Sequence, residues 1–255
     1  MTADLIPPGR WDPVPGGESG ATVHRRADGA AFAKCVPPDG APALRGERDR
    51  IRWLSGTGVP GPSVLDWSCS DRGACLVTSA VPGVPSSELS SSALLAAWPS
   101  IVGTLRRLHA LPAASCPFER ELSTMFAIAE DVVGRGGVHP EFLTEEQRDV
   151  PATDLLAGLR AELGTRLAQE PGDLVVCHGD ACLPNFLVDP DALTCTGLID
   201  LGRLGTADRH ADLALLRANA RESWTGDDAA EAEPLLGEVD AGRMRFYLNL
   251  DPLTW

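Results

Sequence analysis

The sequence predicts an α+β fold of two lobes, a small antiparallel sheet followed by a mainly helical part. Strand-like apolar runs gather in the first third of the chain, at 30–36, 64–67 and 74–81. After the break Pro82-Gly-Val-Pro85, apolar residues recur mainly at helical spacing. In the second half, two further apolar runs each lead into a polar loop, at 176–188 and 197–203. We therefore expect an N-terminal lobe over residues 1–81 and a C-terminal lobe over 82–255. Chains of about this total length, 255 residues, tend to divide their core in two.

The two polar loops carry the chemistry. Asp180 and Asn185 lie in the first loop, H-G-D-A-C-L-P-N, and Asp200 lies in the second, I-D-L-G-R. This set suits phosphoryl transfer from a nucleotide, in which one carboxylate deprotonates a hydroxyl while an amide and another carboxylate hold Mg²⁺. The protein-kinase loops H-R-D-x-x-x-x-N and D-F-G have the same logic. Here Gly179 stands in the Arg position, and D-L-G at 200–202 stands for D-F-G.

An ordinary turn is the alternative for each loop taken singly. H-G-D occurs by chance, and Asp beside Gly or Pro often marks a turn. Chance explains both loops poorly, because the second motif follows the first at a strand-sized distance. The pair of motifs therefore favours a phosphotransferase site.

Lys34 is the single lysine among 22 basic residues. It lies in the predicted strand 30–36, and a lone Lys among arginines indicates a place that needs a compact ammonium, unless it survives by chance. Glu47 follows 13 residues later, on the apolar face of a predicted helix over 44–54. We expect Glu47 to form an ion pair with Lys34 that positions the ammonium on phosphates. The alternative is a surface pair with Arg50, three residues on.

Two further segments are candidates for nucleotide contacts. The Gly-rich turn G-G-E-S-G at 16–20 would let the backbone and Ser19 approach phosphate, although a plain hairpin turn explains it equally well. Neither G-x-G-x-x-G nor a Walker A motif is present. In a two-lobed kinase the break at 82–85 is the hinge, so Ser79 and Val81 are candidates for binding adenine and Thr78 for the back of the pocket.

Helical spacing dominates the chain beyond the hinge. It predicts helices over 92–111, 121–133, 153–167 and 207–220. Pro99 interrupts the first of these and fits the first turn of a second helix. Asp208 and Asp212 lie near the start of the helix predicted over 207–220. Residues 227–240 are acidic and poorly periodic, and 244–250 form a short apolar segment.

The net charge of −14 argues against a nucleic-acid partner and an anionic membrane surface. It suits a cationic small molecule, although acidity also serves solubility. The N-terminal residues lack the pattern of a secretory signal, and no apolar run is long enough to span a bilayer. The seven scattered cysteines are typical of reduced, buried thiols, so we expect a cytoplasmic protein without a zinc site.

Several strings of the sequence resemble those of the aminoglycoside phosphotransferase family, whose members share the protein-kinase fold. They include G-G-E-S-G at 16–20, V-P-G-V-P at 81–85, C-P-F-E-R at 116–120, V-V-C-H-G-D at 175–180, T-G-L-I-D-L-G-R-L-G-T-A-D-R at 196–209 and L-D-P-L-T-W at 250–255. Many small-molecule kinases share H-G-D-x4-N with I-D-x-G-R. The flanking strings narrow the resemblance to members that phosphorylate the 3″-hydroxyl of streptomycin, a reaction that inactivates the antibiotic.

The resemblance implies ATP and Mg²⁺ as cofactors and a role for each matched residue. It implies Asp180 as catalytic base, Asn185 and Asp200 as Mg²⁺ ligands, Lys34 on the α/β-phosphates, Glu47 on Lys34, Ser19 on phosphate from the turn, and Arg203 near the transferring group. His178 would brace the loop. A salt bridge from Arg203 to Asp208 or Asp212 is the alternative for that arginine.

The chain departs from the family pattern between Trp224 and Met244, where it is shorter and more acidic. In this family, acidic residues of the helical lobe line the site of the cationic substrate. Asp251, Glu119 and the acids of 227–240 are therefore candidates to pair with the two guanidinium groups of streptomycin.

Two other functions are compatible with the same motifs. A kinase of another small hydroxyl compound, such as an amino alcohol, a sugar or a macrolide, would share every catalytic residue named. A nucleotide-binding pseudokinase module would share the fold, although it would not need the full set of catalytic residues.

Overall fold

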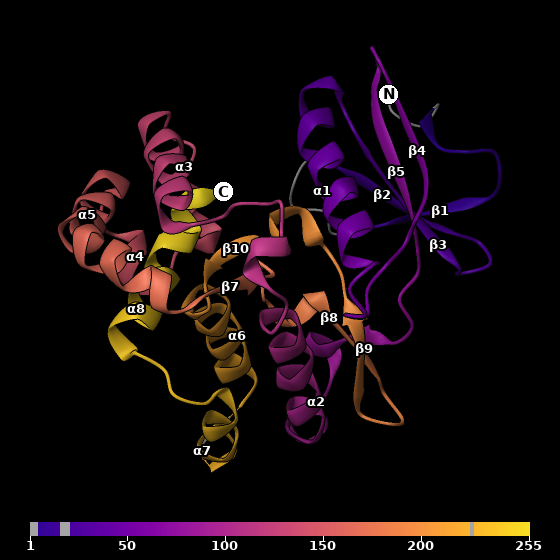
Figure 1. Cartoon of the computed structure of the whole chain (residues 1–255). Coiled ribbons are helices and arrows are strands. Elements are labelled where there is room, and N and C mark those ends of the chain that lie inside the picture. The colour runs from indigo at the N-terminus through magenta and orange to yellow at the C-terminus, as the bar shows by residue number, and fades with distance from the viewer. Residues whose placement is uncertain (1–4, 16–20, 225–226) are drawn as a thin grey trace. The chain divides into compact units, whose positions relative to one another are not determined.

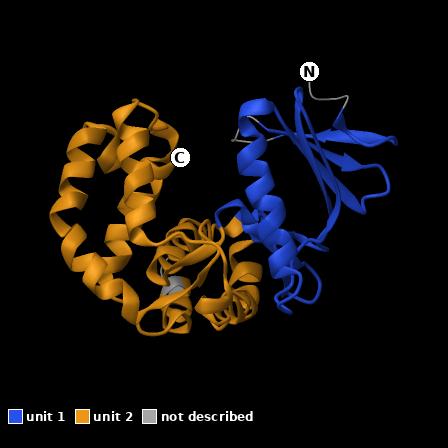
Figure 2. Cartoon of the chain, turned by 45° about the horizontal axis from the view of Figure 1, so that its top comes forward, with its two compact units in different colours: residues 1–88, 184–203 blue, residues 89–183, 204–255 orange. Residues whose placement is uncertain are grey.

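The computed structural model describes residues 5–15, 21–224 and 227–255. The chain divides into two compact units, residues 1–88 with 184–203 and residues 89–183 with 204–255 (Figure 2). The first is rich in strands and the second in helices, as the predicted α+β class requires. The units differ from the expected lobes 1–81 and 82–255, because strands from 82–88 and from 184–203 pair with each other. The lobe division itself stays a prediction.

A five-stranded antiparallel sheet dominates the first unit (Figure 1). In order across the sheet, its strands are β1 (Trp11–Val14), β2 (Thr22–Arg26), β3 (Ala31–Val36), β5 (Gly73–Ser79) and β4 (Val64–Ser70). These confirm the strands predicted at 30–36, 64–67 and 74–81. One face of the sheet buries small residues of β3 and β5 beneath partly buried Leu5, Ile6 and Trp11.

Helix α1 (Ala41–Leu54) confirms the helix predicted over 44–54 and contacts β4 and β5. Its apolar stripe of Leu44, Ile51 and Leu54 is 2% exposed at each position. Burial of such a stripe, at about 1.5–3 kcal/mol for each side chain, fixes which way the helix faces. Glu47 lies on the same buried face.

A smaller sheet completes the first unit. Its strands run in the order β6 (Val84–Pro85), β8 (Phe186–Asp189) and β9 (Thr194–Leu198). Single turns of 3₁₀ helix lie at η2 (Pro38–Gly40), η3 (Ser86–Glu88) and η8 (Leu201–Arg203). The hinge segment is tied to this sheet, because the Thr196 hydroxyl donates to the carbonyl of Leu187 at 3.1 Å and also to that of Pro82.

Gly83 is the position of the hinge that depends most on lacking a side chain. Its φ is +109°, and a Cβ there would lie 2.5 Å from the Val188 carbonyl oxygen. We expect Gly83→Ala to lower the free energy of unfolding by about 2 kcal/mol or more, since left-handed strain alone costs about 1–3 kcal/mol. Thermal or urea unfolding of the purified variant measures this.

Gly164→Ala is the matched control for that prediction. Gly164 lies within a helix, and a Cβ there meets nothing within 4 Å. Replacement should therefore stabilise the protein by about 0.5–1 kcal/mol. Equal effects at the two glycines would contradict the account of the hinge.

The second unit is mainly helical (Figure 1). Its helices are α2 (Ser91–His109), α3 (Leu122–Gly134), α4 (Glu145–Arg148), α5 (Ala152–Gln169), α6 (His210–Ser223), α7 (Asp227–Ala232) and α8 (Ala241–Leu250). Strands β7 (Leu174–Cys177) and β10 (Gly205–Asp208) pair antiparallel. Single 3₁₀ turns lie at η4 (Ala113–Ser115), η5 (Pro140–Phe142), η6 (Glu170–Gly172), η9 (Glu233–Leu236) and η10 (Asp251–Thr254), while η7 (Leu183–Asn185) straddles the boundary between the units.

Two details of the predicted helices are wrong. Helix α2 runs through Pro99 without a second start, because its buried stripe is continuous: Leu94, Trp98, Ile101, Leu105 and Leu108 are 0–1% exposed. That burial outweighs the roughly 3 kcal/mol that an interior proline costs.

The helix predicted over 207–220 begins in the structure at His210, three residues later than predicted. Residues 205–208 form strand β10 instead, because their backbone pairs with β7. The Thr206 backbone also exchanges hydrogen bonds with Phe118 and Arg120, at 2.8 and 2.9 Å. Pairing on both sides holds this segment extended, and the helix starts at His210.

Within the part of the chain that the structure describes, no helix is both long and apolar enough to cross a membrane.

Candidate active site

Lys34 lies at the centre of a charged cluster in the first unit. Its Nζ is 2.8 Å from Glu47 Oε2 on α1 and 3.4 Å from Asp200 Oδ1 in the turn after β9. The ion pair predicted between Lys34 and Glu47 is therefore present. Burial lowers the pKa of Lys34, but the two carboxylates outweigh it and hold that pKa above its ordinary value. The ammonium is thus charged at neutral pH, as binding of phosphate requires.

Glu47 is the nearer of the two carboxylates that contact the Lys34 ammonium, and a role in directing that ammonium stays a prediction. We expect Glu47→Gln to raise the KM for ATP about 10- to 100-fold, because a hydrogen bond to a charged group contributes about 1.5–3 kcal/mol. Steady-state kinetics at varied ATP measure this. Asp49→Asn, on the same helix and paired to Arg48, is the control that should leave KM unchanged. Equal KM values for Glu47→Gln and Asp49→Asn would contradict a positioning role.

Asp200 has an unusual backbone for a residue that is not glycine. Its φ is +56°, a conformation that asparagine and aspartate tolerate better than most residues and that often occurs at functional sites. Its side chain is 52% exposed, whereas the next residue, Leu201, is fully buried. The buried leucine anchors the turn and leaves the carboxylate accessible.

Asn185 and Asp200 are held near each other by their backbones. The Ile199 N–H donates to the Asn185 carbonyl at 3.0 Å, which joins the start of β8 to the end of β9. Their amide and carboxylate oxygens are the hard donors that Mg²⁺ prefers. These two side chains fit a magnesium site, and their role as its ligands stays a prediction.

Asp180 lies in a short loop of the second unit that is held by hydrogen bonds to its backbone. The His178 N–H donates to Asp212 Oδ2 at 2.7 Å, and the Gly179 N–H donates to Asp212 Oδ1 at 2.9 Å. Gly179 has a φ of +80°, which explains a glycine at the Arg position of the kinase motif. The Asp180 N–H donates to His178 Nδ1 at 3.3 Å. His178 is completely buried, in agreement with a bracing role.

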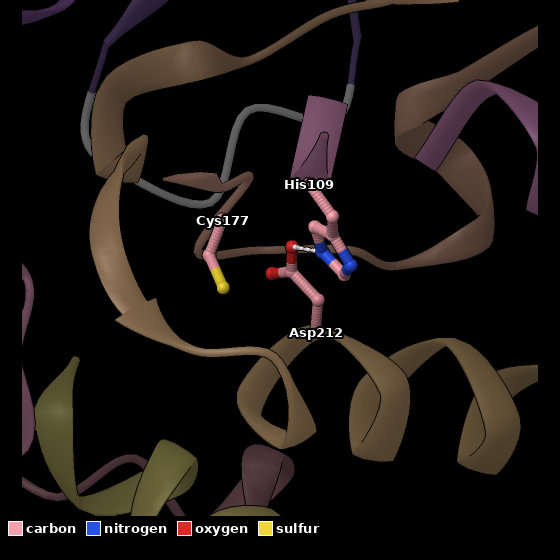
Figure 3. Close-up of side chains that lie close together, drawn as sticks. All are labelled: His109, Cys177 and Asp212. Carbon is pink, nitrogen blue, oxygen red and sulfur yellow. Dashed lines mark hydrogen bonds and ion pairs between the residues drawn. The ribbon is translucent and has the colours of Figure 1, made fainter. Parts of the chain in front are cut away.

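Asp212 is the functional residue that sequence reasoning missed. It is fully buried in α6, and its Oδ2 also lies 2.9 Å from His109 Nε2 on α2 (Figure 3). Burial raises the pKa of Asp212, but hydrogen bonding to His109 and to the loop N–H groups outweighs it and lowers that pKa below its ordinary value. The local sequence offered no signal for this role, because Asp212 resembles an ordinary acid near the start of a predicted helix.

His109, Cys177 and Asp212 bring their side chains together in the manner of a metal site (Figure 3). Their potential ligand atoms lie within 4.8 Å of one another. Two observations favour a different role. The Asp212 oxygens already accept the loop hydrogen bonds, and burial holds the pKa of Cys177 well above its usual range, so its sulfur stays a thiol. We interpret the cluster as the anchor of the Asp180 loop.

The predicted adenine contacts lie at the end of β5. The Ser79 N–H donates to the Ser63 carbonyl, and the Ser79 hydroxyl accepts from the Ser63 N–H, both at 2.9 Å. The Ser79 N–H and hydroxyl therefore take part in hydrogen bonds to the backbone of Ser63. Thr78 and Val81 are half-buried on either side. Nucleotide binding by Thr78, Ser79 and Val81 stays a prediction, and Ser19 lies outside the described residues.

Arg203 ends the 3₁₀ turn η8, and a role near the transferring phosphate stays a prediction. The alternative, a salt bridge to Asp208 or Asp212, also stays a prediction. Asp208 is hydrogen-bonded by His210 and Arg243, and Asp212 holds His109 and the Asp180 loop.

Several acids that were expected to face a cationic substrate are engaged within the fold. Asp251 is 8% exposed, accepts from Trp255 Nε1 at 3.1 Å and lies 3.9 Å from Arg120. Glu233 pairs with Arg217 and Arg221, and Asp240 caps α8. Glu119 is exposed. Substrate contacts by these residues stay predictions.

The comparisons agree on one family. The model of the phosphotransferase enzyme family matches residues 10–247. The chain is 57% identical to the streptomycin 3″-kinase of Streptomyces griseus, over 97% of this chain and 93% of the relative. Among solved structures, aminoglycoside phosphotransferase APH(3″)-Id from Streptomyces rimosus is similar at 55% identity and a TM-score of 0.92, over 96% of this chain and 93% of that one. Its complex with ADP and streptomycin is similar at 53% identity and a TM-score of 0.91, over 96% and 92%.

These likenesses span nearly the whole chain, and they confirm the protein-kinase-like fold expected from the sequence. The Lys34–Glu47–Asp200 cluster and the Asp180 loop lie within the matched region. The chain belongs to the phosphotransferase enzyme family.

Proposed function

We propose that this protein transfers the γ-phosphoryl group of ATP to the 3″-hydroxyl of streptomycin and so inactivates the antibiotic. The observation that carries the proposal is the similarity, at 53% identity across both chains, to a phosphotransferase solved with ADP and streptomycin. The name of the Streptomyces griseus relative gives the same substrate and position. The net charge of −14 suits a substrate with two guanidinium groups.

The residues of the first unit would bind and orient the nucleotide. The Lys34 ammonium would hold the α- and β-phosphates in the direction set by Glu47. Asn185 and Asp200 would hold Mg²⁺, and the ion would supply positive charge that stabilises the negative charge developing on the phosphates. The 3.4 Å distance between Asp200 and Lys34 supports roles for both residues at the same phosphates.

Asp180 would accept the proton of the substrate hydroxyl. The substrate oxygen forms a bond to the γ-phosphorus, the bond from that phosphorus to the bridging oxygen breaks, and ADP leaves with the electron pair. The proton moves to the Asp180 carboxylate late, because the transition state is loose and depends on positioning more than on a strong base. The two backbone hydrogen bonds from the loop to Asp212 would supply that positioning.

An acceptor panel tests the proposal. Purified protein with Mg²⁺-ATP should release ADP with streptomycin, and release with kanamycin, spectinomycin or no acceptor should be far slower. Turnover on another acceptor only would indicate a kinase of a different small hydroxyl compound. Nucleotide binding without turnover on any acceptor would indicate a pseudokinase.

Cytoplasmic location, suggested by the cysteine pattern, stays a prediction.

A further inference from the structure

Cys35 and Cys75 lie directly opposite each other on the neighbouring strands β3 and β5. The hydrogen bonds around them show which kind of pair they form. The Ser79 N–H donates to Ser63, on the β4 side, and the Ala80 N–H donates to Ala30, on the β3 side. Along a strand, the backbone N–H and C=O groups of successive residues point alternately to the two neighbouring strands. Cys75 lies an even number of residues before Ser79, so its backbone groups also point away from β3. Cys35 and Cys75 are therefore a non-hydrogen-bonded pair, in which opposing side chains come closest.

The two sulfur atoms are in contact. Their separation is 2.9 Å, and each residue is 1% exposed within the apolar cluster that covers this face of the sheet. The hydrogen bond between the sulfurs lowers the pKa of Cys35 and raises that of Cys75. The two thiols are therefore not equivalent, and Cys35 gives up its proton more readily than Cys75.

We propose that Cys35 and Cys75 are a site of reversible oxidation, at which a peroxide converts the two thiols to a cross-strand disulfide. The Cys35 thiolate attacks a peroxide oxygen, the oxygen–oxygen bond breaks, and sulfenic acid forms as the first water leaves. The Cys75 sulfur then attacks the Cys35 sulfur, releasing the second water. Two electrons pass from the thiols to hydrogen peroxide, and two thiols with one peroxide give one disulfide and two waters.

The backbone needs little movement to accept this bond. A non-hydrogen-bonded pair has Cα atoms about 4.5 Å apart, and disulfides accept Cα separations of about 4.4–6.8 Å. The side chains must draw together, because a disulfide brings the Cβ atoms to about 3.8 Å from the usual 4.5–5.5 Å of a cross-strand pair. The change is therefore concentrated at one register of the sheet.

That register adjoins Lys34, which precedes Cys35 and lies opposite Leu76. Lys34 holds Glu47 at 2.8 Å, so the small adjustment of Cys35 that brings the Cβ atoms together shifts the adjacent ammonium relative to its partner. Oxidised protein should bind ATP several-fold more weakly than reduced protein, and dithiothreitol should restore binding. This consequence rests on the role proposed for Lys34, whereas formation of the disulfide does not.

The test treats reduced, purified protein with graded hydrogen peroxide, blocks free thiols with an alkylating reagent and maps the linkages by mass spectrometry. Streptomycin-dependent ADP release and ATP affinity are measured on the same samples, before and after dithiothreitol. The expected result is a Cys35–Cys75 linkage that rises with dose, a parallel fall in ATP affinity, and recovery of both on reduction. The mapping needs no catalytic activity, so it stands apart from the proposed function.

Single variants complete the design. Cys75→Ala and Cys35→Ala should keep their ATP affinity in peroxide, whereas Cys69→Ser, at an exposed position, should respond as the parent does. If Cys35 and Cys75 were still free thiols at a peroxide dose that oxidises Cys69, the proposed oxidation site would be wrong. Two results would overturn the proposed effect of the disulfide on nucleotide binding. One is a Cys35–Cys75 linkage that leaves ATP affinity unchanged, and the other is a loss of ATP affinity in peroxide-treated Cys75→Ala equal to that of the parent.

Discussion

Replacing Asp180 by Asn is expected to lower kcat by about 10²–10⁴-fold, the usual contribution of a general base. The change removes the proton acceptor and keeps the size of the side chain. The loop should stay in place, because its hydrogen bonds to Asp212 come from the backbone of His178 and Gly179. Nucleotide affinity should therefore change little. Steady-state kinetics and a fluorescent-nucleotide titration measure the two quantities.

Asp191→Asn is the control for this prediction, because Asp191 is exposed in the turn between β8 and β9. It should keep the parent kcat. Activity of Asp180→Asn within a few-fold of the parent would show that another group accepts the proton.

Asp212→Asn is expected to lower both stability and turnover. The parent carboxylate is completely buried and accepts from two backbone N–H groups and His109. An amide can offer only one oxygen, so a buried donor loses its partner, at a cost of about 1–3 kcal/mol, and more where charge is involved. The loop that carries Asp180 should lose its position, and kcat should fall at least about tenfold with it.

The pH dependence of unfolding separates this role from a general loss of packing. The pKa of Asp212 is lowered in the folded protein. Its contribution to stability is therefore complete above the ordinary carboxyl pKa and is lost as the pH falls through the depressed one. The difference in unfolding free energy between parent and Asp212→Asn should shrink as the pH is lowered through that acidic range.

Glu222→Gln is the matched control, since Glu222 is an exposed acid on the same helix. It should differ from the parent by less than about 0.5 kcal/mol. A stability difference for Asp212→Asn that stays constant with pH would contradict the role of the ionised carboxylate.

The sequence predicted the elements whose signals are local. Strands β3, β4 and β5 and helix α1 follow from runs and spacings of a few residues. The Lys34–Glu47 contact was predictable because a strand and the next helix carried one charge each on faces that had to meet. The motif loops were found because their chemistry requires fixed spacing.

The features that were missed depend on long-range partners. Asp212 holds backbone groups 33 and 34 residues earlier in the chain, and no local pattern distinguishes it from an acid at a helix start. Strand β10 forms because Val175 and Val176 supply a partner for it. Pro99 was misread because burial along α2 outweighs its local preference. In each case tertiary contacts outweighed local preference.

Identification of the product tests the central claim most directly. Streptomycin incubated with the protein and Mg²⁺-ATP should gain a single phosphate by mass spectrometry, and NMR should show phosphorus coupling at the 3″ position. The Asp180→Asn variant should give almost none of this product in the same time. Phosphate at another hydroxyl, or unmodified streptomycin while nucleotide is bound, would contradict the proposed reaction.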